Sequence, residues 1–210
     1  DIVGGFGADL VMDCSGNPSA GPEGIEFLRD GDTYVEMGEF TDAGSWVSLG
    51  LSVVDEPSGV SAVAKLGPDP VDPLFAPADL DGVIVGRRKQ LKAVLQEQES
   101  LAGIGNAYSD EILHLAKLSP VVQAAALTPD ERERLFAATT GVVRGAIDAR
   151  RGIPIDQLKA AKVASMRVHG RAGEPCPVCG DEIRDLAFGS TTAQYCPTCQ
   201  NGGAVLGAPT

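Results

Sequence analysis

Long hydrophobic runs are missing from the 210-residue sequence. It has no stretch of about eighteen consecutive apolar residues, which a membrane-spanning helix would need. It also lacks the charged segment followed by an apolar stretch that marks a secretory signal. We therefore expect a soluble, cytoplasmic protein with no membrane partner.

Basic residues are nearly absent from the first 86 residues. This part carries only Arg29 and Lys65 against 16 acids, a net charge of −14. Residues 87–171 carry 14 Lys and Arg against nine acids, a net of +5, and residues 172–210 have a net of −3. The total of −12 is therefore misleading as an average, because a polyanion would be attracted to the middle segment. Charge alone leaves open the simpler interpretation that these cations solvate helix surfaces.

The start of the chain alternates between strand and helix patterns. Turn residues and β-favouring runs predict strands over 9–13 and 33–37, with a helix over 23–28 between them. Apolar residues alternate over 47–54, which predicts a further strand with one buried face. Residues 55–78 are rich in Pro, Gly and Asp, as is typical of an ordered linker between domains.

Helical patterns dominate the middle of the chain. Apolar spacing predicts helices over 79–85, 90–98, 107–117 and from 129 to about 151. The last of these has the best start signal, because Thr128 can be the N-cap, Pro129 fits the first helical position and Glu131 completes a capping box. Between the second and third helices, Gly103 and Gly105 would allow a positive φ and the close approach of a backbone or a phosphate.

Four of the five cysteines form two Cys-x-x-Cys pairs, Cys176 with Cys179 and Cys196 with Cys199, 16 residues apart. This spacing is typical of a four-cysteine zinc site. Four thiolates leave no open position for water, so the ion would be structural, and the intervening residues suit a β-hairpin that needs the metal to fold. A redox dithiol or two disulfides are the alternatives. We expect the fifth cysteine, Cys14, to be a buried, inert thiol.

Two stretches resemble a known family. LKAVL at 91–95 and LAGIGNAYSDE at 101–111 resemble the helix-two-turns-helix motif of the formamidopyrimidine-DNA glycosylase and endonuclease VIII family. VHGRAGEPC at 168–176 is similar to the lead into that family's zinc finger, and KLGPDP at 65–70 is a further match. The resemblance covers residues 45–206.

The resemblance implies a mostly α fold with a small β zinc ribbon. A helix-two-turns-helix DNA-binding domain would follow a short α/β fragment, and one structural Zn²⁺ would be the cofactor. The expected partner is duplex DNA with a lesion or an abasic site, bound by a nucleoid-associated monomer. Lys92 and Asn106 match the family's residues that hold backbone phosphates. The expected DNA-binding residues are Lys92, Gly103, Gly105, Asn106, Tyr108, His169 and Arg171.

Two departures from the family affect the expected activity. The family's catalytic Pro-Glu start has no counterpart in Asp1-Ile2, so we assign no catalytic residue, and Thr191 stands where an arginine of the finger is usual. The leading hypothesis is the DNA-binding half of a base-excision-repair glycosylase with impaired catalysis. The alternative is an active bifunctional DNA glycosylase and abasic-site lyase acting on oxidised bases, with a substitute amine such as Lys92.

Residues 3–44 resemble a fragment of a different family, the zinc-dependent alcohol dehydrogenases. GADLVMDCSG at 7–16 and GDTYVEMG at 31–38 match its nucleotide-binding domain. No G-x-G-x-x-G motif precedes a helix, and a strand, helix and strand cannot bind a dinucleotide without the rest of the sheet. A dehydrogenase-like nucleotide binder is therefore a minor alternative. The expected domains are 1–45 (α/β fragment), 46–78 (strand and linker), 79–171 (DNA-binding domain) and 172–206 (zinc finger).

Overall fold

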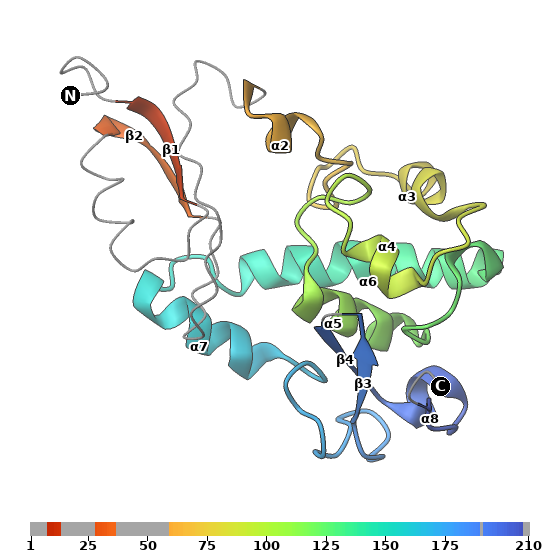
Figure 1. The fold of residues 1–210 in the computed structure, drawn as a ribbon. Coiled ribbons are helices and arrows are strands. Elements are labelled where there is room, and N and C mark those ends of the chain that lie inside the picture. The colour runs from red at the N-terminus through yellow and green to blue at the C-terminus, as the bar shows by residue number, and fades with distance from the viewer. Residues whose placement is uncertain (1–7, 14–27, 37–58, 190, 208–210) are drawn as a thin grey trace. The chain divides into compact units, whose positions relative to one another are not determined.

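The computed structural model of the chain describes residues 8–13, 28–36, 59–189 and 191–207 (Figure 1). The chain divides into two compact units, residues 1–65 and residues 66–210. Among the helices in these described ranges, none is long and apolar enough to cross a bilayer.

The first unit contains two parallel strands, β1 (Ala8–Asp13) and β2 (Leu28–Glu36). Their register pairs Leu10 with Thr33. Both predicted strands are present. β2 begins earlier than predicted, at Leu28, which pairs with Ala8, and the register shifts between this pair and the pair of Leu10 with Thr33.

Other expectations for the beginning of the chain cannot be compared with the structure. The helix predicted over 23–28, apart from Leu28, and the strand predicted over 47–54 lie outside the described residues, as does Cys14. Within the predicted linker, Ser61–Ala64 forms the short helix α2.

The second unit is mostly helical and ends in a small antiparallel sheet. Its elements are α3 (Pro77–Ile84), α4 (Leu91–Leu95), α5 (Asn106–Ala116), the 3₁₀ helix η2 (Ala124–Ala126), α6 (Pro129–Asp148), α7 (Ile155–Ser165), β3 (Arg184–Phe188), β4 (Thr191–Tyr195) and α8 (Pro197–Asn201). This is the mostly α fold with a β ribbon that the sequence predicts.

Helix α5 is central to this unit and lies between α6 and the β3–β4 hairpin in Figure 1. Ile112 and Leu113 of α5 are fully buried and pack with Leu91 and Leu95 of α4 and Leu135 of α6. Helix α5 contacts α4, α6, β4 and α8, so the helical part of the unit and the C-terminal hairpin both pack against it. Any group that this helix positions is therefore held by the main core.

The start of α6 agrees with its sequence signal. Thr128 Oγ1 accepts a hydrogen bond from the Glu131 N–H at 3.3 Å, and a Glu131 carboxylate oxygen accepts one from the Thr128 N–H at 2.8 Å. Pro129 occupies the first turn. The reciprocal capping box satisfies two backbone donors that a helix start leaves unpaired.

Two helix ends and one additional helix differ from the sequence expectation. α4 ends at Leu95 because the chain turns at Gln96, so the predicted helix over 90–98 is too long. α6 ends at Asp148 and is followed by turns as far as Gly152, whose φ is +81°. α7, after Pro154, is absent from the sequence analysis, because an exposed helix shows little apolar periodicity.

Candidate nucleic-acid interface and zinc centre

The glycine-rich turn before α5 is braced by a glutamine side chain. Gln98 Oε1 accepts the Gly103 N–H at 2.9 Å, and its Nε2 donates to the Ile104 carbonyl at 2.8 Å. Gly103 has a φ of +81°, and a Cβ at Gly103 or Gly105 would meet nothing within 4 Å. The turn is therefore held by two side-chain hydrogen bonds and leaves space at its two glycines. The sequence pattern includes Gln98 only as the last residue of the helix predicted over 90–98 and gives no sign of this role.

The KLGPDP segment at 65–70 is hydrogen-bonded to the residues that lead into the same turn. The Gly67 N–H donates to the Gln98 carbonyl at 2.8 Å, and the Ala102 N–H donates to the Pro68 carbonyl at 3.1 Å. A Cβ at Gly67 would lie 2.5 Å from the Ser100 carbonyl oxygen, so only glycine allows this approach.

Helix α5 begins at this turn without a side-chain cap. Gly105 is the N-cap and offers no side chain to the first-turn N–H groups, which leaves the positive end of the helix dipole available to an anion. The Asn106 side chain lies beside it. Its Oδ1 accepts from Gln96 Nε2 at 3.1 Å, and its Nδ2 donates to the Thr192 carbonyl of β4 at 3.3 Å. The zinc ribbon thus contacts the turn through Asn106.

Lys92, expected to hold a backbone phosphate, lies inside the protein with its ammonium bound to protein groups. The side chain is 0% exposed, and Nζ donates to Asp110 Oδ1 at 2.6 Å, Ser109 Oγ at 2.9 Å and the Asn106 carbonyl at 3.2 Å. Burial lowers the pKa of Lys92, against the opposing effect of Asp110. Since its three N–H donors are occupied, Lys92 holds the first turn of α5 in place.

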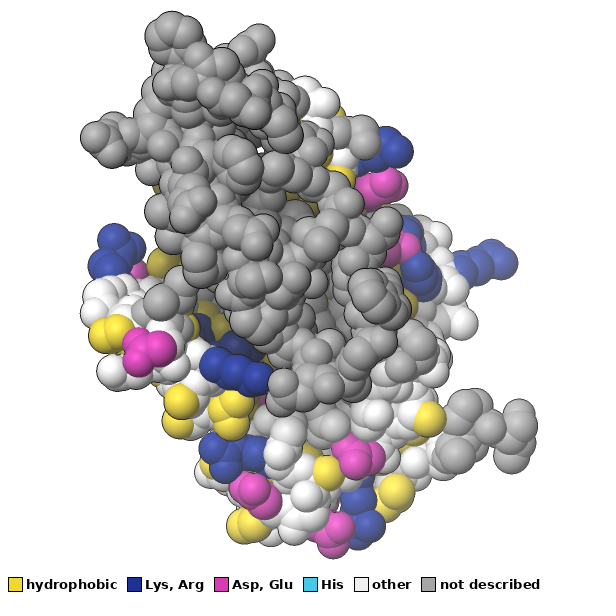
Figure 2. Space-filling model, turned by 60° about the vertical axis from the view of Figure 1, so that its left-hand side comes forward, with side chains coloured by type: hydrophobic (Ala, Val, Ile, Leu, Met, Phe, Trp, Pro, Cys, Tyr) yellow, Lys and Arg dark blue, Asp and Glu magenta, His cyan; other side chains and the backbone are white. Residues whose placement is uncertain are grey.

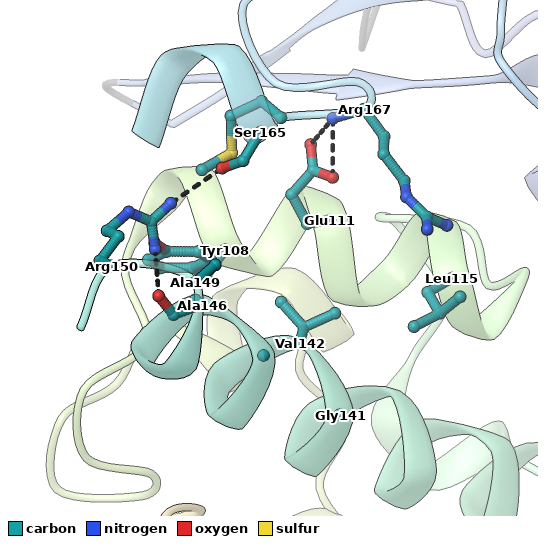
Figure 3. A pocket seen from close by; sticks show the side chains of 12 residues that line it. Tyr108, Glu111, Leu115, Gly141, Val142, Ala146, Ala149, Arg150, Ser165 and Arg167 are labelled. Carbon is teal, nitrogen blue, oxygen red and sulfur yellow. Dashed lines mark hydrogen bonds between the residues drawn. The ribbon is translucent and has the colours of Figure 1, made fainter. Parts of the chain in front are cut away.

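Two neighbouring acids on α5 attach the chain that leads into the zinc finger. Asp110 Oδ2 lies 2.8 Å from His169 Nδ1. The Glu111 carboxylate accepts the backbone N–H groups of Arg167, Val168 and His169 at 2.9 to 3.0 Å; Figure 3 shows the bonds to Arg167. Both acids are almost completely buried. The sequence analysis misses them because a pair of acids on a helix normally marks a solvated face.

The structure does not bring the remaining expected contact residues to the turn as one group. Tyr108 is half-buried on another face of α5, with Arg150 and Lys162 5.8 and 5.6 Å from its ring centroid. Burial raises its pKa. It lines a pocket between α5, α6 and the end of α7 (Figure 3). Arg171 is engaged by the Met166 carbonyl at 2.6 Å and by Glu174 at 2.9 Å.

The four paired cysteines converge on one point. All four Sγ atoms lie within 4.8 Å of one another, with Cys176 and Cys199 3.9 Å apart and Cys179 and Cys196 3.3 Å apart. A tetrahedron of Zn–S bonds of about 2.3 Å has edges of about 3.8 Å. These separations fit a shared metal and are too long for disulfides. The cysteines therefore form the site of one structural zinc ion.

Thiol ionisation shows why the site needs a cation. Burial raises the pKa of Cys196 to about 11 and raises that of Cys199 further. Burial also opposes ionisation of Cys176, but hydrogen bonds from backbone N–H groups and from the His114 ring outweigh it and lower its pKa. The pKa of Cys179 is lowered as well, chiefly by a hydrogen bond from the Asp181 N–H. A bound cation favours the thiolate form of all four cysteines, and zinc supplies one.

The residues between the knuckles form the predicted β-hairpin. β3 and β4 are antiparallel, with Arg184 opposite Tyr195 and Phe188 opposite Thr191. The hairpin buries few large side chains, chiefly Leu186 and Tyr195. Thr191 is exposed where the family usually has an arginine, so the hairpin tip provides no cation there.

Comparison with known families and proteins gives a consistent result. Residues 66–156 match the family described as formamidopyrimidine-DNA glycosylase H2TH domain, and residues 173–202 match the zinc finger found in FPG and IleRS. An uncharacterised formamidopyrimidine-DNA glycosylase-like protein of Mycobacterium tuberculosis is 43% identical over 149 residues, which are 71% of this chain and 93% of that protein.

Longer relatives match over part of their length. The formamidopyrimidine-DNA glycosylase of Symbiobacterium thermophilum is 39% identical over 66% of this chain and 47% of its own length. That of Geobacillus kaustophilus is 38% identical, and 52% of its length is covered. The chain therefore spans about half the length of the glycosylases that it matches.

Solved structures agree with these matches. The MutM (Fpg) protein of Thermus thermophilus superposes with a TM-score of 0.61 at 30% identity, over 72% of this chain and 60% of that chain. The Lactococcus lactis Fpg in complex with DNA containing an abasic site gives a TM-score of 0.63 at 27% identity, over 73% and 58%. This chain belongs to the formamidopyrimidine-DNA glycosylase family, of which it carries the helix-two-turns-helix domain and the zinc finger.

Proposed function

We propose that residues 66–206 bind damaged duplex DNA through its phosphates, as the DNA-binding half of a base-excision-repair glycosylase. The observation that carries this proposal is the start of α5, which no side chain caps and where a Cβ at Gly103 or Gly105 would meet nothing within 4 Å. Such a helix start binds anions through its N–H groups and its dipole. A DNA phosphate is the anion that fits the family.

The choice of damaged DNA as partner is supported by relatives of similar fold. One solved relative is MutM in complex with DNA containing carbocyclic 8-oxo-G, with a TM-score of 0.64. The Lactococcus lactis Fpg was solved with abasic-site DNA. For this chain we propose a lesion or an abasic site in a duplex as the target and a monomer as the binding species.

Charge alone supports the proposal less strongly than the helix start does. Some cations of the positive middle segment are already paired, since Arg87 and Lys89 both bind Glu97. These partners, Lys89 most strongly, lower the pKa of Glu97 to about 2. Over the described part of the face in Figure 2, Lys and Arg side chains stand beside acidic ones. Phosphate binding would therefore depend on the turn.

We expect Asn106→Asp to weaken DNA binding more than it weakens the fold, where it removes one hydrogen bond, from Nδ2 to the Thr192 carbonyl. The new carboxylate would repel phosphate, whereas an acid in the first turn of a helix is favourable for the helix itself. A hydrogen bond to a charged group contributes roughly 1.5–3 kcal/mol, so the affinity should fall about 10- to 150-fold. Fluorescence anisotropy with a duplex carrying an abasic-site analogue would measure the change, at several salt concentrations because phosphate binding weakens with salt.

Gln157→Glu is the matched control. It makes the same charge change at an exposed position in the first turn of another helix, α7. We expect it to reduce affinity only slightly. Equal losses in the two variants would show that net charge matters and the turn does not, and binding indifferent to salt would rule out phosphate recognition.

We propose further that residues 66–206 contribute affinity for DNA and do not supply the amine that reacts with the sugar. The alternative of an active lyase needs a nucleophile such as Lys92, but this amine is fully buried and paired with Asp110. We expect borohydride treatment with abasic-site DNA to give no covalent adduct at Lys92. Peptide mapping by mass spectrometry is the measurement, and an adduct on Lys92 would restore the lyase alternative.

A further inference from the structure

His114 of α5 faces the zinc site and takes no part in the glycine-rich turn before α5. Its side chain is buried, with 3% of the residue exposed, and its Nε2 lies 3.3 Å from Cys176 Sγ. The two residues are 62 positions apart in the sequence, so the contact joins the helical domain to the zinc ribbon.

The surroundings of the ring decide which nitrogen carries the proton. Cys176 can bind zinc only as a thiolate, and a thiolate accepts hydrogen bonds but cannot donate them. The Nε2 atom must therefore carry a hydrogen. Nδ1 is buried without a hydrogen-bond partner among the described residues, so a second N–H there would be unpaired. A hydrogen on Nε2, with none needed on Nδ1, fits the surroundings of both nitrogens.

A donor at this point matters because of the charge of the zinc centre. Four thiolates and one Zn²⁺ leave two net negative charges, and N–H groups around the sulfur atoms offset them. The backbone N–H groups of Val178 and Cys179 serve Cys176, and that of Asp181 serves Cys179. These donors belong to the ribbon itself. His114 adds a donor from helix α5 of the main helical core.

We propose that His114 is an outer-sphere zinc residue: its Nε2–H donates to the Cys176 thiolate, strengthens zinc retention and fixes the ribbon on α5. Groups that hydrogen-bond to metal ligands orient them and tune the metal, and their loss commonly lowers metal affinity about 10- to 100-fold. The proposal is independent of nucleic-acid binding.

The tautomer can be read in the unaltered zinc protein. Long-range ¹H–¹⁵N correlation spectra of histidine-labelled protein distinguish a protonated from an unprotonated ring nitrogen. We expect Nε2 of His114 to carry a proton. A proton on Nδ1 with an unprotonated Nε2 would overturn the proposal, regardless of the zinc affinity of the variants.

Zinc retention gives a second test. We expect His114→Phe, which keeps a flat ring and removes the donor, to lower zinc affinity about 10- to 100-fold in competition with a chromogenic chelator. Leu135→Ala is the control, because it destabilises the core from α6 without a polar group facing the zinc site. Unchanged affinity in His114→Phe, or an equal loss in both variants, would overturn the proposal. Loss confined to His114→Phe would support it.

Discussion

Removal of zinc is expected to unfold residues 172–206 and to leave helices α3 to α6 folded. Structural zinc sites of this kind bind with an apparent free energy of about 10–16 kcal/mol, far more than the small apolar cluster around Leu186 and Tyr195 can supply. The purified protein should contain one zinc per chain by elemental analysis. After chelation, hydrogen exchange should show loss of protection in β3 and β4, while the amides of Ile112 and Leu135 stay protected.

Two cysteine variants separate loss of a ligand from loss of a thiol. Cys179→Ser removes one of the four converging sulfur atoms and should abolish stoichiometric zinc. Cys14→Ser removes the fifth cysteine and should leave the zinc content at one per chain. A protein that keeps its hairpin protected after the zinc has been removed would contradict this prediction, because the ribbon would then have another source of stability.

The sequence predicts the zinc centre well because the information is local. Two Cys-x-x-Cys pairs at the correct separation define both the ligands and the hairpin between them. The start of α6 is equally local, since a capping box needs only Thr128 and Glu131. The glycine-rich turn is also recognisable, although its brace, Gln98, has no sequence signal of its own.

The role of Lys92 could not be predicted, because it depends on tertiary packing. Apolar spacing places this residue on a helix, where a lysine is normally solvated. Its partner Asp110 lies 18 positions further along the chain, on a different helix, and only the packing of α4 on α5 brings the two together. The same applies to Glu111, whose three backbone donors come from a segment more than 50 residues later.

Asp110→Ala is expected to cost about 3–5 kcal/mol of stability, because it leaves the ammonium of Lys92 buried without its counter-charge. Denaturation in urea measures this loss. The loss should depend on pH. Burial already lowers the pKa of Lys92 below its ordinary value of 10.5, and Asp110 is the group that opposes this shift. In the variant, the folded state therefore binds fewer protons than the unfolded state between the lowered pKa and 10.5, so stability should rise with pH across that interval.

The double variant Lys92→Met with Asp110→Ala tests whether the loss comes from an uncompensated charge. Removing both members of a buried pair is far less costly than removing one, so the part of the loss that comes from the Lys92 charge should return and the rise with pH that it causes should vanish. The contact of Asp110 with His169 stays lost in both variants. Asp148→Ala is the matched control, since its ion pair with Arg151 has both side chains more than 70% exposed. Such a pair contributes about 0–1 kcal/mol. If Asp110→Ala cost no more than this control, or if the double variant were no more stable than the single one, Lys92 would not be a buried cation held by Asp110.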